Sequence, residues 1–117
     1  MIFFILIAIL IENTAWANSH HPAVFLKKIT GSNNEGLLIV QHYCATCHAE
    51  KPKIPLGAPR IGQISEWQHR LKRGFASLWQ HTNEGYGAMP ARGGCFECSD
   101  KQLRLAIEAL LPSNKEK

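Results

Sequence analysis

The feature that most constrains this chain is the short stretch Cys44-Ala45-Thr46-Cys47-His48. The Cys-x-x-Cys-His spacing is the attachment pattern for c-type haem. Two cysteines three residues apart at a helix end can each add to a haem vinyl group, while the adjacent imidazole turns toward the iron. The covalent bonds also keep the haem on a chain of 117 residues, which is long enough for only one small domain. We therefore expect Cys44 and Cys47 to bind haem c covalently, and His48 to be an axial ligand of its iron.

Two other uses of cysteine fit parts of the same pattern. A dithiol redox pair has the Cys-x-x-Cys spacing, but normally at the start of a helix in a fold that contains strands. A zinc ribbon would combine Cys44 and Cys47 with the second pair, Cys95 and Cys98. The two pairs are much farther apart than the roughly fifteen to twenty residues of such a site. The export signal and the helical pattern described below favour haem over both alternatives.

Helix signals recur along the chain. Three stretches have the Ser-x-x-Glu/Gln pattern with which a helix start satisfies its own backbone donors, and each precedes apolar residues at helical spacing. They are Ser32 to Glu35, Ser65 to Gln68 and Ser99 to Gln102. The expected apolar faces are Leu37, Val40 and Cys44, then Trp67 and Leu71, then Leu103, Ile107 and Leu110. A fourth helix is predicted from Phe75, Leu78, Trp79 and Thr82, ending at Gly85 and Gly87. No stretch alternates in twos, so we predict an all-α fold.

The first residues indicate an export signal. An apolar run extends from Ile2 to Ile11, and Ala15-Trp16-Ala17 is the small-x-small pattern after which signal peptidase cuts. We expect residues 1–17 to be removed on export, which makes the protein periplasmic. The run is about half of the roughly 20 residues that cross a bilayer, so an uncleaved anchor is the less favoured alternative. No Lys or Arg precedes the run, which is unusual for an export signal.

Haem iron needs a sixth ligand or an open position, and this choice decides the function. Beyond the signal segment the chain has a single methionine, Met89, in the glycine-containing stretch GYGAMP. With a haem on the chain, Met89 is the expected sixth ligand. The competing histidines are His42, His69 and His81, each on a predicted helix, and His81 is the strongest of them because it lies near Met89 in sequence.

The formal charge of the whole chain is +4 at pH 7. Such an excess fits an acidic partner surface, but from charge alone a solvated, soluble surface is the favoured interpretation. The basic residues are not clustered tightly enough to indicate nucleic acid binding.

The run GGCFECSD after GAMPARG, together with CATCH and GAPRIG, resembles bacterial cytochromes of the c5 type, within the small monohaem class of cytochrome c. The resemblance implies about four helices around the covalent haem, in residues 35–112. Residues 18–34 would be a loosely structured lead-in, and residues 113–117 a C-terminal tail. The first and last helices would cross at Gly36, against Ala109 or Leu110.

The resemblance also implies roles for individual residues. His48 and Met89 would be the axial ligands, and the carbonyl of Pro59 would accept a hydrogen bond from the second nitrogen of His48. Cys95 and Cys98 would form a disulfide that braces the turn after Met89.

The function expected from these features is one-electron transfer, since iron with both axial positions filled has no room for oxygen or peroxide. Partners would be a terminal oxidase or reductase and an upstream cytochrome complex, with peripheral contact to membrane complexes. Basic residues near the haem edge would steer docking: Lys51, Lys53, Arg60 and Arg92. Apolar residues expected to surround the haem are Ile61, Ile64, Trp67, Leu71, Phe75, Leu78, Trp79 and Tyr86. The alternative is a small peroxidase-like haem enzyme with an open sixth position.

Overall fold

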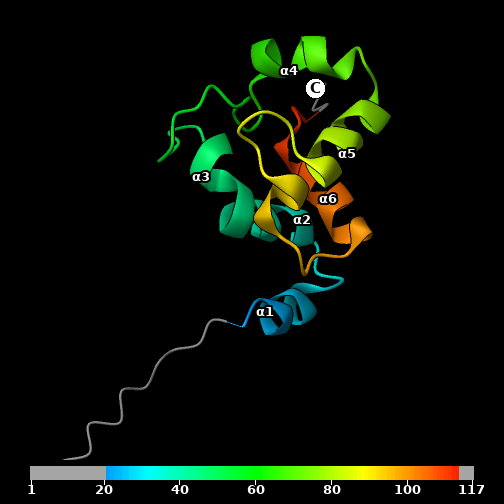
Figure 1. Ribbon diagram of the computed structural model, residues 1–117. Helices are drawn as coiled ribbons and strands as arrows, with labels where there is room; N and C mark the ends of the chain where they lie inside the picture. Colours follow the sequence, from blue (N-terminus) through cyan, green and yellow to red (C-terminus); the bar gives the residue numbers. More distant parts are fainter. Residues whose placement is uncertain (1–20, 114–117) are drawn as a thin grey trace, which may run out of the picture.

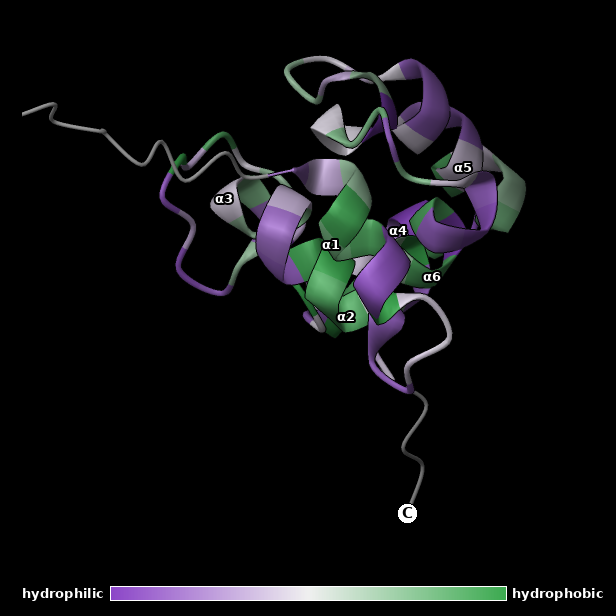
Figure 2. Ribbon diagram, turned by 90° about the horizontal axis from the view of Figure 1, so that it is seen from below, coloured by the Kyte–Doolittle hydropathy of each residue, from purple (hydrophilic) through white to green (hydrophobic). Residues whose placement is uncertain are grey.

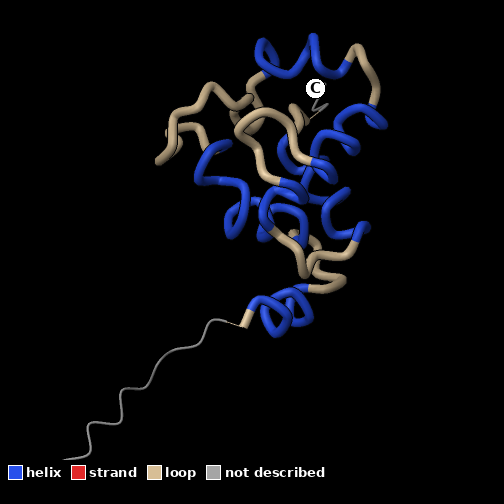
Figure 3. Tube along the Cα trace, in the orientation of Figure 1, coloured by secondary structure: helices blue, strands red, loops and turns tan. Residues whose placement is uncertain are grey.

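The computed structural model describes residues 21–113, and within them the protein is built from helices without a strand. Figure 3 shows the helices and their connecting loops. The elements are α1 (Pro22–Ile29), α2 (Glu35–Ile39), η1 (Val40–Cys44), α3 (Ala45–His48), α4 (Ile64–Leu71), α5 (Phe75–Glu84), η2 (Ala91–Gly94) and α6 (Asp100–Leu110). The all-α prediction is confirmed. The expected signal peptide, residues 1–17, and most of the C-terminal tail lie outside the described residues.

The elements α2, η1 and α3 follow one another without a break and form one long helix (Figure 1). Its middle part, Val40–Cys44, has the wider π-helical hydrogen bonding. A π turn holds more residues than an α turn, so it rotates the side chains that follow it. The predicted apolar face is wrong at its start, before the π turn, since Leu37 is 39% exposed whereas Ile39 is completely buried.

Helices α2 and α6 pack against each other more extensively than any other pair. A Cβ atom added at Gly36 would lie 2.2 Å from the backbone oxygen of Leu105, so only glycine allows this approach. The predicted crossing at Gly36 is confirmed, but its partner is Leu105 rather than Ala109 or Leu110.

Helix α6 begins with the capping box predicted for it. The Ser99 hydroxyl accepts from the Gln102 backbone N–H at 3.1 Å, and the Gln102 side chain accepts from the Ser99 N–H at 3.0 Å. The apolar residues Leu103, Ile107 and Leu110 are buried on one face, as predicted, and the helix stops before Pro112.

The other two capping boxes do not form. Helix α2 begins after Asn34, and the Glu35 carboxylate accepts from the Gly31 N–H at 2.8 Å instead of closing a box with Ser32. Helix α4 begins after Gln63, which places Ser65 inside the helix. In both cases the residues before the helix provide other contacts at its first turn.

The lead-in was expected to be loosely structured, and this is wrong for residues 22–29, which form helix α1. Leu26 and Ile29 are buried in the core. The Gln102 side chain donates to the Leu26 carbonyl at 3.3 Å and to the Glu35 carboxylate at 3.0 Å, which joins α1, α2 and α6. Figure 2 shows the hydrophobic segments of α1 and α2 side by side. Helix α1 is thus part of the domain.

None of the helices within residues 21–113 has the length and apolar character needed to span a bilayer.

Candidate haem-binding site

A cavity of about 490 Å³ lies between α3, α4, α5, α6 and the loop that follows α5. Cys44, Cys47, His48 and Met89 all line it. The fold therefore brings the Cys-x-x-Cys-His motif and the distant methionine to one place. The volume is in the range of roughly 300–1,000 Å³ that binds small molecules and cofactors.

His48 is buried, and its ring orientation is fixed by the loop before α4. Its Nδ1 atom lies 2.7 Å from the carbonyl oxygen of Pro59. A carbonyl can only accept, so Nδ1 carries the proton and Nε2 is the nitrogen left to bind a metal. The Ile61 N–H also donates to the His48 backbone oxygen at 2.8 Å, which gives this loop a second bond to the same residue.

The same loop is held from its other side by two adjacent residues of α4. The Glu66 carboxylate accepts from the Arg60 backbone N–H at 2.7 Å and from the Arg60 Nε at 2.9 Å. The Trp67 indole N–H donates to the Arg60 carbonyl at 2.8 Å, and the Trp67 ring stacks near His48 with centroids 6.3 Å apart. The hydrogen bonds from Arg60 lower the pKa of Glu66, so its carboxylate stays charged. No local sequence pattern predicts this arrangement.

The two thiols of the motif are half-buried and not in a disulfide. Burial raises the pKa of Cys44 to about 11, and the nearby Cys47 adds to the shift. Before any bond to a cofactor forms, Cys44 is therefore a protonated thiol at neutral pH. Both sulfur atoms belong to residues of the cavity wall, where they could bond to a cofactor edge.

Met89 lies in a tight loop after α5. Its backbone N–H and carbonyl both pair with Tyr86, each at 3.0 Å. The loop closes only because Gly85 has a positive φ of 84°, and a Cβ there would lie 2.9 Å from the Met89 carbonyl oxygen. The Tyr86 ring stacks on His81 with centroids 4.1 Å apart, which ties the loop to α5.

The three competing histidines are placed differently. His69 and His81 line the cavity together with Met89, whereas His42 does not. The His42 ring instead stacks on Phe25 of α1, with centroids 3.9 Å apart.

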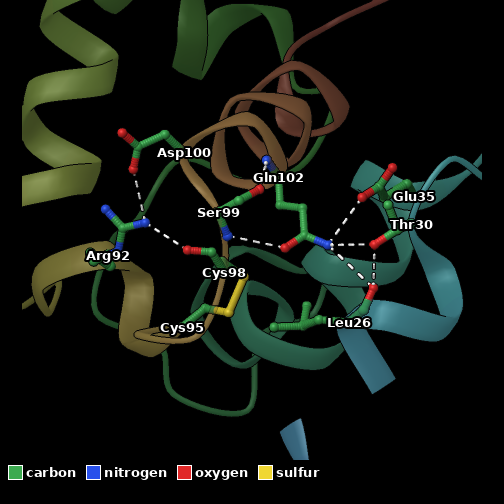
Figure 4. Close-up of a disulfide and its surroundings, with 9 residues drawn as sticks. All are labelled: Leu26, Thr30, Glu35, Arg92, Cys95, Cys98, Ser99, Asp100 and Gln102. Atoms are coloured by element: carbon green, nitrogen blue, oxygen red, sulfur yellow. Dashed lines mark hydrogen bonds and ion pairs between the residues drawn. A yellow bond between two sulfur atoms is a disulfide. The ribbon is translucent and has the colours of Figure 1, made fainter. Parts of the chain in front are cut away.

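Cys95 and Cys98 form a disulfide, as the family resemblance implied. Both cysteines are buried, and the turn that they close leads directly to Ser99 and α6 (Figure 4). Because these sulfurs are already paired, a zinc site made of four cysteines is not formed. Across residues 21–113 there is also no group of three or more His, Cys, Asp or Glu side chains that could hold a metal ion.

The expected apolar wall is largely wrong. Of the eight residues predicted, Leu78 and Tyr86 line the cavity. The six that do not are Ile61, Ile64, Trp67, Leu71, Phe75 and Trp79. Apolar residues that line it without having been predicted include Ile39, Leu56, Leu103, Ala106, Ile107 and Leu110.

The reason is that helical spacing shows which residues share a face, but not what that face meets. Ile64 is 65% exposed, on the outside of α4. Trp79 faces α6, where the guanidinium carbon of Arg104 lies 4.3 Å from the centre of its ring. The buried face of α6, assigned only to the helix crossing, is also a wall of the cavity.

Two of the four basic residues expected to steer docking are engaged within the chain. Arg60 pairs with Glu66 at 2.8 Å, and Arg92 pairs with Asp100 at 3.1 Å. Lys51 and Lys53 are exposed.

The cavity fits a haem in its chemistry. It combines two thiols, an imidazole with one nitrogen hydrogen-bonded to a backbone carbonyl, a thioether and apolar walls. Arg70 and Arg73 also line it and could neutralise the carboxylates that a haem carries. These two cations were not predicted to belong to the site, because the helical pattern in which they lie is typical of exposed surface.

Comparison with known proteins gives consistent matches. A family model described as cytochrome c oxidase, cbb3-type, subunit III matches residues 31–108. Cytochrome c5 of Azotobacter vinelandii is 35% identical over 79 residues, which is 66% of this chain and 92% of that protein. Cytochrome c5 of Ectopseudomonas mendocina is 35% identical over 74 residues, covering 62% of this chain and 82% of that protein. Cytochrome c-555 of Chlorobaculum tepidum is 33% identical over 76 residues, 62% and 68% of the two chains.

A solved structure is also similar. It is described as an electron transfer complex of nitrite reductase with cytochrome c, and the matched chain is 30% identical to this one. The TM-score is 0.58, and the match covers 65% of this chain and 89% of the other.

Proposed function

Because this chain belongs to the cytochrome c family and is a monohaem cytochrome of the c5 type, we propose that it is a periplasmic one-electron carrier with His48 and Met89 as axial ligands. Its cofactor is covalently bound haem c, which supplies a one-electron couple between ferric and ferrous iron. The observation that carries the proposal is that Cys44, Cys47, His48 and Met89 line one cavity.

His48 holds the proximal side. Its Nδ1 proton is donated to the Pro59 carbonyl at 2.7 Å, so Nε2 carries no proton and would be the atom that binds the iron. A hydrogen bond to the far nitrogen of a ligating histidine fixes the ring and raises its basicity. Pro59 is therefore a positioning residue for the ligand.

Met89 fills the distal side. A neutral thioether favours ferrous iron and so raises the reduction potential. The apolar walls act in the same direction, because burial disfavours the extra positive charge of the ferric state. With both axial positions filled, oxygen and peroxide are excluded, which favours a carrier over the peroxidase-like alternative.

The docking face is the mouth of the cavity. Leu56 and Tyr86 line the cavity and are also exposed, and the exposed Ile54 lies on the same loop as Leu56. Lys51 and Lys53 are exposed and belong to the same loop as Ile54 and Leu56. Such a surface suits brief, salt-sensitive encounters with an acidic oxidase, reductase or upstream cytochrome. The solved complex of nitrite reductase with cytochrome c supports a reductase as one class of partner.

Carbon monoxide binding to the ferrous protein tests this function. The wild-type protein should bind carbon monoxide poorly, because Met89 occupies the position that the gas needs, whereas Met89→Ala should bind it readily. Ready binding by the wild type would favour the open-site enzyme instead.

A further inference from the structure

Arg92 has an unusual backbone conformation. Its φ is 57°, and among residues 21–113 it is the single residue other than glycine with a positive φ. A Cβ atom makes this conformation unfavourable, so a residue with a side chain needs compensating contacts to keep it. Gly93 and Gly94, which follow, also have positive φ and carry no such penalty.

The compensating contacts are made by the guanidinium. Nη1 donates to the Asn83 side-chain oxygen at 2.7 Å, and Nη2 donates to the Cys98 backbone carbonyl at 2.7 Å. Nη2 also lies 3.1 Å from a carboxylate oxygen of Asp100. The Arg92 side chain is only 21% exposed, so its bonds to Asn83 and Cys98 are partly shielded from water, whereas Asp100 is 71% exposed and its ion pair is open to solvent. Figure 4 shows the bonds to Cys98 and Asp100.

These partners come from both ends of the loop that carries Met89. Asn83 is near the end of α5, whereas Cys98 and Asp100 are at the start of α6. The disulfide closes only the turn from Cys95 to Cys98 and does not reach α5. The guanidinium therefore spans the base of the loop.

The residue after Arg92 lies close to the proposed ligand. A Cβ built on Gly93 would lie 3.8 Å from the Met89 methyl carbon. A shift of Arg92 would thus move the backbone that lies next to the thioether side chain. Arg92 itself is part of the cavity wall.

From these contacts we infer that Arg92 is a positioning residue that holds the Met89 loop closed, and so controls how readily an external ligand replaces the thioether. The inference rests on the proposed function, since it requires Met89 to be the sixth ligand. It also gives Arg92 a role other than docking.

Imidazole binding to the ferric holoprotein tests this inference. The probe must displace Met89, so its apparent affinity depends on how often the loop opens. Arg92→Gly is the decisive variant because it relieves the unfavourable φ and removes the guanidinium. We expect it to bind imidazole roughly tenfold more tightly or more, as is typical when a shielded charged hydrogen bond is lost. Arg92→Lys should be intermediate, since an ammonium does not reproduce the fork of the guanidinium.

Lys101→Gln is the matched control. It removes one positive charge from the exposed first turn of α6, next to Asp100, without touching the loop. We expect its imidazole affinity to equal that of the wild type. If Arg92→Gly also binds imidazole like the wild type, or binds it more weakly, backbone geometry alone holds the loop and the inference is overturned.

Two further variants carry the test if Arg92→Gly does not yield holoprotein. Asn83→Ala removes one hydrogen-bond acceptor and Asp100→Asn removes the negative charge opposite the guanidinium, and both keep Arg92, so each should raise imidazole affinity by a smaller factor. Wild-type affinity in both would overturn the inference. The far-red sulfur-to-iron band of the wild type separates the two proposals. If the band is absent, Met89 is not the ligand and the proposed function fails. If the band is present and the variants bind imidazole like the wild type, only the role of Arg92 fails.

Discussion

The Nδ1 atom of His48 and the carbonyl oxygen of Pro59 lie 2.7 Å apart, and two residues of helix α4 hold the loop that makes this bond. Glu66 accepts from the Arg60 backbone N–H, and Trp67 donates to the Arg60 carbonyl, so the residue after Pro59 is fixed on both sides. The hydrogen bond that tunes the proposed proximal ligand thus depends on residues outside the cavity.

Glu66→Ala should raise the reduction potential. Without the carboxylate the Pro59 carbonyl moves away from Nδ1, His48 becomes less basic and ferric iron loses stabilisation. The loss of part of the free energy of one hydrogen bond corresponds to a shift of roughly 20–60 mV in the reduction potential of a one-electron couple. Redox titration measures it, and Glu84→Ala is the control because Glu84 is an exposed carboxylate that accepts a hydrogen bond from Gln80 in the same helix. Equal shifts in the two variants would mean that net charge, not the hydrogen bond, sets the potential.

Gly36→Ala should destabilise the fold by roughly 1–3 kcal/mol or more, the usual cost of overpacking. The added carbon would lie 2.2 Å from the Leu105 oxygen, so α2 and α6 must separate. Denaturant unfolding of the holoprotein gives the value. Leu37→Ala, on the half-exposed side of the same helix, should cost much less. A stable Gly36→Ala protein would show that the two helices can shift apart cheaply.

Leu26→Ala tests whether α1 belongs to the domain. Leu26 is 4% exposed in the core, so its truncation should cost roughly 2–5 kcal/mol, whereas Val24→Ala in the same helix should be nearly neutral because Val24 is 66% exposed. Thermal unfolding compares the two. If both variants melt like the wild type, α1 does not contribute to the folded core.

Replacing both Cys95 and Cys98 by serine should leave the haem attached, because Cys44 and Cys47 are unchanged. Loss of the cross-link should lower stability by roughly 2 kcal/mol and loosen the loop that carries Met89. Melting temperature and reduction potential are the measurements. A double variant unchanged in both would show that the disulfide is not needed as a brace.

Much of the fold could be predicted from the sequence, because the relevant signals are local. The faces of α5 and α6 follow from apolar spacing, and their ends follow from Gly85 and Pro112. The start of α6 follows from the Ser99 capping box. Helix α1 has no side-chain N-cap from which its start could be predicted. It is held by contacts with Gln102, which is far away in sequence.

The candidate site also combines features that could be predicted from the sequence with features that could not. Cys44, Cys47, His48 and Met89 were predicted from residue type and spacing, and the structure places them around one cavity. The bonds of Glu66 and Arg92 depend on how segments meet in space, so no sequence pattern reveals them. The walls formed by α6 were missed for the same reason.

The absorption spectrum of the exported protein tests the central claim, that Met89 and His48 ligate a covalently bound haem. The account predicts a haem that stays on the denatured chain, and a weak far-red sulfur-to-iron band in the oxidised protein that disappears in Met89→Ala. A covalent haem without that band in the wild type would mean that a histidine or water is the sixth ligand, and would contradict the account.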